Sequence, residues 1–179
     1  MYPERLVKVG VADAESLIVY AQGHLVLWTA AGENLQLSVR GLEALKDSRV
    51  QKIAIANPEH APYWRAAVAA LKKAGLYDQV KAKLVYGENV SQAAQFAQSR
   101  SAQVGIVALS LTFGESMKSG EKWEIPPGYY PPIKQEAVMI NSSPNKATVR
   151  AFLEFVKSEE GRTTLARYGL TPPVATTKP

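Results

Sequence analysis

One stretch decides the fold, namely Lys52-Ile53-Ala54-Ile55-Ala56-Asn57-Pro58-Glu59-His60-Ala61-Pro62-Tyr63-Trp64-Arg65. Its apolar start, residues 52–56, predicts a buried strand, and residues 63–73 predict a helix that ends at Gly75. A strand that leads through a short loop into a helix directs backbone N–H groups into a crevice, where they hold anions without a positive side chain. We therefore expect a ligand at the loop formed by residues 57–62.

The same pattern recurs directly afterwards. Residues 83–86 predict a strand, Gly87-Glu88-Asn89-Val90 a loop, and residues 91–98 a helix, and a further strand follows at residues 103–109. Alternation of strands and helices is typical of a largely parallel sheet covered by helices. The predicted fold class is α/β, with a mixed and mostly parallel sheet.

The flanking regions predict smaller elements. Before the central stretch these are a helix at 3–9, strands at 16–20 and 24–28, and a brief helix at 41–45. Residues 112–130 are rich in glycine and charge and run into Pro126-Pro127, which fits neither a helix nor a central strand. We interpret residues 112–130 as a connection between two lobes.

The C-terminal part predicts a strand at 135–140 and two helices. The first has Ser143 as its N-cap and Pro144 in its first turn, and ends at Lys157. Its predicted inward stripe consists of Val149, Phe152, Leu153 and Val156. The second runs from 159 to 168.

Composition excludes several classes of protein. The 21 Lys and Arg residues exceed the 16 Asp and Glu residues, but they are scattered, which favours a solvated surface over a nucleic-acid interface. The absence of cysteine removes thiolate metal sites and cysteine nucleophiles. No apolar run approaches the roughly 18 residues of a membrane span. The first residues show no signal peptide, so we expect that the protein stays inside the cell or that its front end is missing.

The usual catalytic motifs are also absent. Gly114-Glu115-Ser116-Met117-Lys118 lacks the final glycine of a nucleophile elbow, and no phosphate-binding glycine loop occurs. His24 and His60 are the only histidines, and they do not have metal-ligand spacing. Glu59 and His60 form either an acid/base pair or, as we favour, structural parts of the loop. We expect a binding protein with no cofactor and no metal ion, rather than an enzyme.

Three ordered motifs and the C-terminus carry a family resemblance. The stretch 52–63, the segment 84–93, the run Val104-Gly105-Ile106-Val107-Ala108-Leu109-Ser110 and the ending Tyr168-Gly169-Leu170-Thr171-Pro172-Pro173 resemble the molybdate-binding proteins of bacterial ABC importers. The resemblance covers essentially the whole chain. It implies a type II periplasmic binding-protein fold, in which two α/β lobes hold an oxyanion between them.

The resemblance also implies positions for the lobes and the site. Residues 30–109 correspond to the second lobe, and residues 1–29 and 110–179 correspond to a partial first lobe. The positions that match oxyanion-binding residues of the family are Tyr63 and Val90, through their backbone N–H groups. Trp64 and Ala108 are further candidates, since Trp64 stands where relatives commonly have Gly and Ala108 where some relatives have a Tyr.

The family begins with about two further β-α units, which implies that part of the first lobe and of the oxyanion shell is absent. We expect weakened binding and an exposed first-lobe sheet edge, through which a dimer or a domain swap would form. The implied ligand is molybdate or tungstate, the implied partner is an ABC permease subunit, and the implied location is periplasmic or lipid-anchored outside the cell. The alternative is an oxyanion-sensing effector domain of a regulatory protein. An enzyme of the porphobilinogen-deaminase or aminotransferase kind ranks third, because the cysteine and the catalytic lysine signature are missing.

Overall fold

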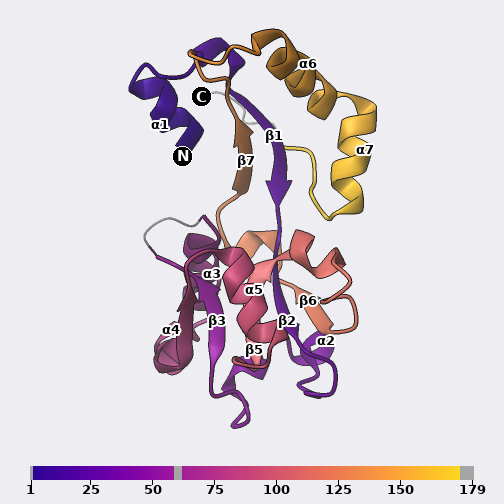
Figure 1. Ribbon diagram of the computed structural model, residues 1–179. Helices are drawn as coiled ribbons and strands as arrows, with labels where there is room; N and C mark the ends of the chain where they lie inside the picture. The colour runs from indigo at the N-terminus through magenta and orange to yellow at the C-terminus, as the bar shows by residue number, and fades with distance from the viewer. Residues whose placement is uncertain (1, 59–61, 174–179) are drawn as a thin grey trace. The chain divides into compact units, whose positions relative to one another are not determined.

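The computed structural model describes residues 2–58 and 62–173 and divides into two units (Figure 1). Unit 1 combines both ends of the chain, Met1–Gly23 and Lys134–Pro179, and unit 2 is the middle, His24–Ile133. The family resemblance implies lobe boundaries at 29/30 and 109/110, and these stay a prediction. The units have other boundaries because the strands on both sides of the predicted second lobe pair with its sheet.

Unit 2 is built on a mixed sheet with the strand order β4-β3-β5-β2-β6 among the described residues. The strands are β2 (Leu25–Thr29), β3 (Ile53–Ala56), β4 (Leu84–Gly87), β5 (Val104–Ala108) and β6 (Glu121–Glu124). β3 pairs in parallel with β4 and β5, whereas β2 pairs antiparallel with β5 and β6. The mixed sheet is as predicted, but the parallel pairings do not outnumber the antiparallel ones.

Helices cover both faces of this sheet. They are α3 (Pro62–Lys73) and α5 (Val90–Gln98), close to their predicted bounds, whereas the short helix α4 (Tyr77–Val80) was not predicted. Alternate side chains of a strand point to opposite faces, so Ile53 and Ile55 lie in the core with α3, while Ala54 lies in the core with α5. Gly75 follows α3 with φ +71°, which confirms its predicted role at the helix end.

Residues 112–130 are part of unit 2, and the prediction of a connection between lobes is wrong for them. β6 pairs with β2 from Glu121 to Glu124. The indole N–H of Trp28 donates to the carbonyl of Met117 at 2.8 Å, and the N–H of Leu25 donates to the Tyr130 hydroxyl at 3.1 Å. Since these partners are far apart in sequence, local composition gave no sign of the pairing.

Short helical segments complete the unit: α2 (Leu37–Arg40), η2 (Gly41–Lys46), η3 (Lys81–Lys83), η4 (Leu109–Phe113) and η5 (Pro127–Tyr129).

Unit 1 contains α1 (Tyr2–Lys8), η1 (Ala14–Ser16), β1 (Ile18–Gly23), α6 (Lys146–Lys157), α7 (Glu159–Arg167) and all of β7 (Ile133–Ala137) except its first residue. β1 and β7 form a two-stranded sheet in the described part of the chain. The side chains of Ile18, Val19 and Tyr20 in β1 are only half-buried. The apolar core of unit 1 is correspondingly small, and includes Ala21, Met139, Leu153 and Val156.

Two predictions about α6 are wrong. The helix begins at Lys146 with Asn145 as N-cap, rather than after Ser143, although the Ser143 hydroxyl accepts from the N–H of Asn145 at 3.3 Å as an N-cap side chain would. Phe152, a member of the predicted inward stripe, is 59% exposed, although Leu153 and Val156 are buried as predicted. The apolar stripe of α6 is wider than the surface of the described unit 1 residues against which the helix packs, so part of the stripe is exposed.

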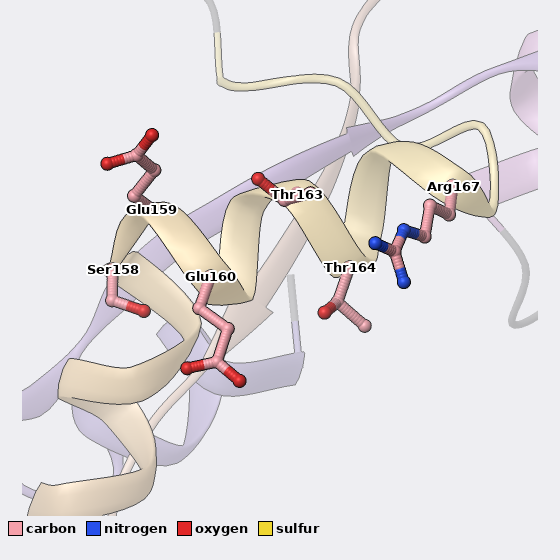
Figure 2. Close-up of a pocket in the computed structure, with 6 residues that line it drawn as sticks. All are labelled: Ser158, Glu159, Glu160, Thr163, Thr164 and Arg167. Carbon is pink, nitrogen blue, oxygen red and sulfur yellow. The ribbon is translucent and has the colours of Figure 1, made fainter.

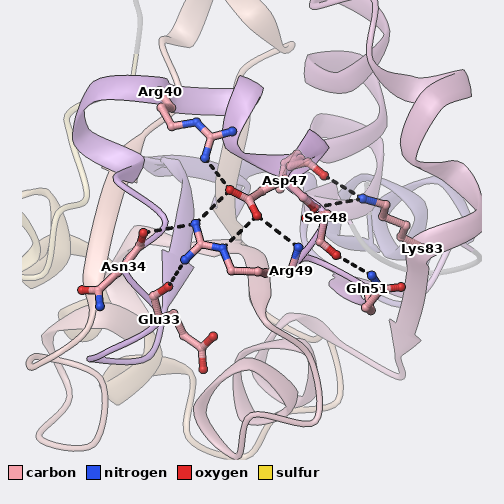
Figure 3. A network of polar contacts seen from close by, with 9 residues as sticks. Glu33, Asn34, Arg40, Asp47, Ser48, Arg49, Gln51 and Lys83 are labelled. Carbon is pink, nitrogen blue, oxygen red and sulfur yellow. Dashed lines mark hydrogen bonds and ion pairs between the residues drawn. The ribbon is translucent and has the colours of Figure 1, made fainter.

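A polar cluster around Asp47 fixes the loops before β3 in unit 2 (Figure 3). The Asp47 carboxylate accepts two hydrogen bonds from the Arg49 side chain, both at 2.9 Å, and one from Arg40 at 2.7 Å. Arg49 also donates to the carbonyls of Glu33 and Asn34. These contacts, first those of Arg49 and then those of Arg40, hold the pKa of Asp47 far below its usual range.

Asp47→Asn tests this cluster. A carboxylate whose pKa is lowered on folding stabilises the protein above its unfolded pKa of about 3.9, and that stabilisation is lost as the pH falls toward the folded pKa. The melting temperature of the variant should therefore lie below that of the wild type at pH 7, and the gap should narrow below about pH 4. Asp78→Asn is the control, because its pair with Lys81 is exposed and should matter little. An equal difference in melting temperature between wild type and Asp47→Asn at pH 3 and pH 7 would contradict the lowered pKa of Asp47.

Candidate functional site

The predicted site residues of unit 2 gather at one edge of its sheet. β4, β3 and β5 run in parallel, and Ala56 is opposite Gly87 in their register. The carboxyl ends of these strands therefore meet at the same edge, where α3 and α5 begin. Tyr63 is the second residue of α3, Val90 is the first residue of α5, and Ala108 is the last residue of β5.

The start of α5 is an open helix N-terminus. Asn89 is the N-cap in an extended conformation, and its side chain accepts from the N–H of Gln92 at 2.9 Å. The first N–H groups of a helix find no acceptor within the helix. The described residues provide no acceptor for the N–H groups of Val90 and Ser91. Together with the positive end of the helix dipole, these two groups are suited to an anion.

Gly87 brings the end of β4 directly against this turn. A Cβ atom placed on Gly87 would lie 2.6 Å from the backbone nitrogen of Ala93 and 3.0 Å from the carbonyl carbon of Gln92. Both neighbours are backbone atoms of the first turns of α5, which cannot move independently of the helix. Glycine is thus required here because the strand and the helix approach so closely.

Tyr63 and Trp64 lie in the first turn of α3, and both are half-buried and packed against the core of unit 2. The indole Nε1 of Trp64 is buried and has no hydrogen-bond acceptor in the part of the chain that the structure describes. A buried donor without an acceptor costs about 1–3 kcal/mol, so its position calls for a compensating role.

Ala108 is 2% exposed and lies opposite Leu25 of β2. The N–H of the next residue, Leu109, donates to the carbonyl of His24 at 2.9 Å, and η4 begins there. Ala108 therefore contributes backbone at the sheet edge rather than a reactive side chain. Glu59 and His60, which the sequence predicts as parts of the loop before α3, lie outside the described residues.

Sequence reasoning missed Gln92. Its side-chain Oε1 accepts from the N–H of Glu88 at 2.7 Å, while its own N–H donates to Asn89. The spacing Asn89-x-x-Gln92 is that of a capping box and is visible in the sequence. The prediction for this loop rested on Glu88 and Asn89 alone and did not extend into the first turn of the helix.

Other features of the described residues give little support to a different site. They contain no group of three or more His, Cys, Asp and Glu side chains placed to hold a metal ion. Among the same residues, no helix combines the length and the apolar character needed to cross a bilayer.

Unit 1 carries a surface hollow along α7 (Figure 2). It is lined by Ser158, Glu159, Glu160, Thr163, Thr164 and Arg167. The hydroxyl of Ser158 caps the helix by accepting from the N–H of Gly161 at 3.1 Å. The carboxylates of Glu159 and Glu160 stand at that same end of the helix, whereas Arg167 stands at the other. Two carboxylates at the helix N-terminus disfavour an anionic ligand there.

Residues 1–171 match the sequence pattern of a family described as bacterial extracellular solute-binding protein. The chain belongs to this family. Its α/β fold is that of periplasmic binding proteins, as predicted, since the structure superimposes on a solved periplasmic molybdate-binding protein.

The relatives of this solute-binding protein include molybdate-binding proteins. It is 36% identical over 167 residues to the molybdate-binding protein ModA of Rhodobacter capsulatus, covering 93% of this chain and 64% of that protein. It is 36% identical over 168 residues to ModA of Azotobacter vinelandii, covering 93% and 66%. The solved periplasmic molybdate-binding protein of Azotobacter vinelandii matches with a TM-score of 0.86 and 32% identity, and the match covers 96% of this chain and 74% of that chain. The chain spans about two thirds of the length of these two curated relatives.

Gly87→Ala tests the close approach at the start of α5. The added methyl group has to displace backbone, so we expect a loss of about 1–3 kcal/mol in the free energy of unfolding, measured by urea denaturation. Gly128→Ala is the matched control, because a Cβ atom added to Gly128 would have no neighbour within 4 Å and the φ angle of this residue is not positive. Equal stabilities of the two variants would show that β4 and α5 are not tightly packed at this point.

Proposed function

We propose that this protein binds molybdate or tungstate at the edge of the unit 2 sheet, for import by an ABC transporter. The observation that carries the proposal is the start of two helices, α3 and α5, at the carboxyl ends of adjacent parallel strands. The relatives named for molybdate binding support the choice of anion. In this proposal Tyr63 and Val90 supply backbone N–H groups to the oxyanion.

The chemistry of these donors suits a dianion that carries no proton. Backbone N–H groups donate hydrogen bonds but accept none, so an oxyanion that still holds a proton would leave that proton without a partner. The donors are also neutral, which avoids the several kcal/mol that desolvating a Lys or Arg side chain costs. Helix N-termini hold such donors in place before the ligand arrives.

Trp64 and Ala108 are further members of the proposed site. Trp64 follows Tyr63 directly and carries an indole N–H without an acceptor among the described residues. Ala108 ends the strand next to β3 on the opposite side from β4. We assign Trp64 as an additional donor or closing wall and Ala108 as backbone lining.

The biological setting is part of the same proposal. A solute-binding protein of an ABC importer delivers its ligand to a permease and catalyses no reaction itself. We accordingly propose a periplasmic or lipid-anchored extracellular protein that has a permease subunit as its partner, binds no nucleic acid and needs no cofactor.

Val90→Pro tests the site without an obvious cost to the fold. Proline is favoured as the first residue of a helix, and Asn89 already has the extended conformation, ψ 177°, that a residue before proline prefers. The substitution therefore deletes one N–H group and also replaces the Val90 side chain, which packs against the core of unit 2. Titration calorimetry with molybdate should show affinity at least about tenfold weaker than that of the wild type, since a hydrogen bond to a charged group contributes about 1.5–3 kcal/mol.

Val90→Ala is the control for this titration, because it shortens the side chain and keeps the N–H group. Tungstate, sulfate and phosphate are titrated alongside molybdate. Unchanged affinity in Val90→Pro would remove Val90 from the site, and a wild-type chain that binds none of the four anions would refute the proposed function.

We further propose that unit 1 associates with a second copy of this chain. Phe152 and Phe155, on one side of α6, are 59% and 43% exposed. The sheet of β1 and β7 has two strands in the described residues, and a two-stranded sheet is only marginally stable alone. Exposed strand edges and apolar helix faces favour pairing with another chain.

Light scattering coupled to size-exclusion chromatography tests this association. The wild type should have twice the mass of the 19.5 kDa chain, and the double variant Phe152→Ser/Phe155→Ser should shift toward the monomer. Val39→Ser, at a valine of unit 2 that is 84% exposed, should leave the mass unchanged. A monomeric wild type at all concentrations would contradict the proposal.

A further inference from the structure

We infer that Gln92 is a positioning residue for the oxyanion. Its uncharged side chain and its backbone N–H form a clamp of two hydrogen bonds, to Glu88 and Asn89. This clamp decides which N–H groups of the turn that begins at Gly87 face the oxyanion. This inference rests on the proposed function, because it assumes that the anion binds at the start of α5. The clamp itself consists of contacts within unit 2.

The clamp closes on both sides of the free N–H groups. On one side the Oε1 atom of Gln92 accepts from the N–H of Glu88 at 2.7 Å, and on the other the N–H of Gln92 donates to Oδ1 of Asn89 at 2.9 Å. The N–H of Ala93 is also occupied, since it donates to the carbonyl of Asn89 at 3.1 Å. The N–H groups of Asn89, Val90 and Ser91 thus lie between those of Glu88 and Gln92, which are already bonded.

The arrangement differs from the usual capping box in one respect. In that motif the side chain at the third helical position accepts from the N–H of the N-cap residue itself. Here Gln92 reaches one residue further back, to Glu88, and so ties the end of the loop to the helix. Gly87 also lies close to the backbone of Gln92 and Ala93, and this contact holds the end of β4 against the same turn.

The neutrality of Gln92 matters as much as its hydrogen bond. Glutamate fills the same capping position equally well and is favoured by the helix dipole. A carboxylate there would stand within one helical turn of the bound dianion and repel it. The turn already carries the exposed carboxylate of Glu88, so a second negative charge would oppose anion binding further. Glutamine keeps the clamp and avoids the charge.

Two substitutions at Gln92 separate geometry from charge. Gln92→Glu keeps the acceptor for the N–H of Glu88, so its urea denaturation midpoint should equal or exceed that of the wild type. Its molybdate affinity, measured by titration calorimetry in low salt, should nevertheless be at least about fivefold weaker, and the deficit should shrink in about 0.5 M NaCl because salt screens the charge. Gln92→Ala loses the acceptor, and both its stability and its affinity should fall, with no salt-dependent recovery.

Gln98→Glu is the matched control, because it places the same charge on an exposed residue at the far end of α5. Its molybdate affinity should stay within about twofold of the wild type, given a separation of about 9 Å along the helix axis from Gln92. If the wild type binds molybdate and both Gln92 variants bind it with the same affinity, the inference about Gln92 is wrong, but the proposed function stands. A stable wild-type chain that binds no oxyanion would overturn the proposed function and the inference with it.

Discussion

Parallel pairing of β4, β3 and β5 is the constraint on which the candidate site depends. Because these strands point the same way, each returns through a helix on a face of the sheet, and the helices must start where the strands end. The register that sets Ala56 opposite Gly87 brings the starts of α3 and α5 to one edge. Both faces of the sheet are consequently buried, Ile53 and Ile55 with α3 and Ala54 with α5. Without this pairing, Tyr63 and Val90 would have no reason to lie near each other.

The chemistry of that edge comes from backbone and from neutral side chains. The side chains of Gln92 and Asn89 bond the N–H groups of Glu88 and Gln92, and Gly87 allows the strand to approach the helix. A site of this kind holds an anion through oriented dipoles, and its affinity depends on the order of the turn more than on any one side chain. The same logic explains why the proposed oxyanion ligand would require no cluster of cationic residues here.

The two units differ in how completely they bury their apolar residues. In unit 2 the sheet lies between two helical layers, and contacts distant in sequence, such as Trp28 with Met117, hold the segment before β6 against the sheet. In unit 1 the sheet has two strands in the described residues, and α6 leaves Phe152 and Phe155 exposed. Since apolar burial is the main stabilising term of folding, the more complete burial in unit 2 should make it the more stable of the two units.

The sequence by itself determined the alternating elements from β3 to β5, because strand and helix periodicities and the glycine at position 75 are local signals. The same motifs identified the family, and with it the α/β class. The positions of Tyr63, Trp64, Val90 and Ala108 in the site stay predictions. Only the tertiary structure decided that residues 112–130 join the sheet through β6, that Phe152 faces outward and that Gln92 clamps the turn before α5. Each of these findings depends on a neighbour in space. β6 pairs with β2, a strand distant in the chain, and Phe152 is exposed because the surface that α6 packs on is too narrow for its apolar stripe. Gln92 accepts from a backbone N–H four residues back.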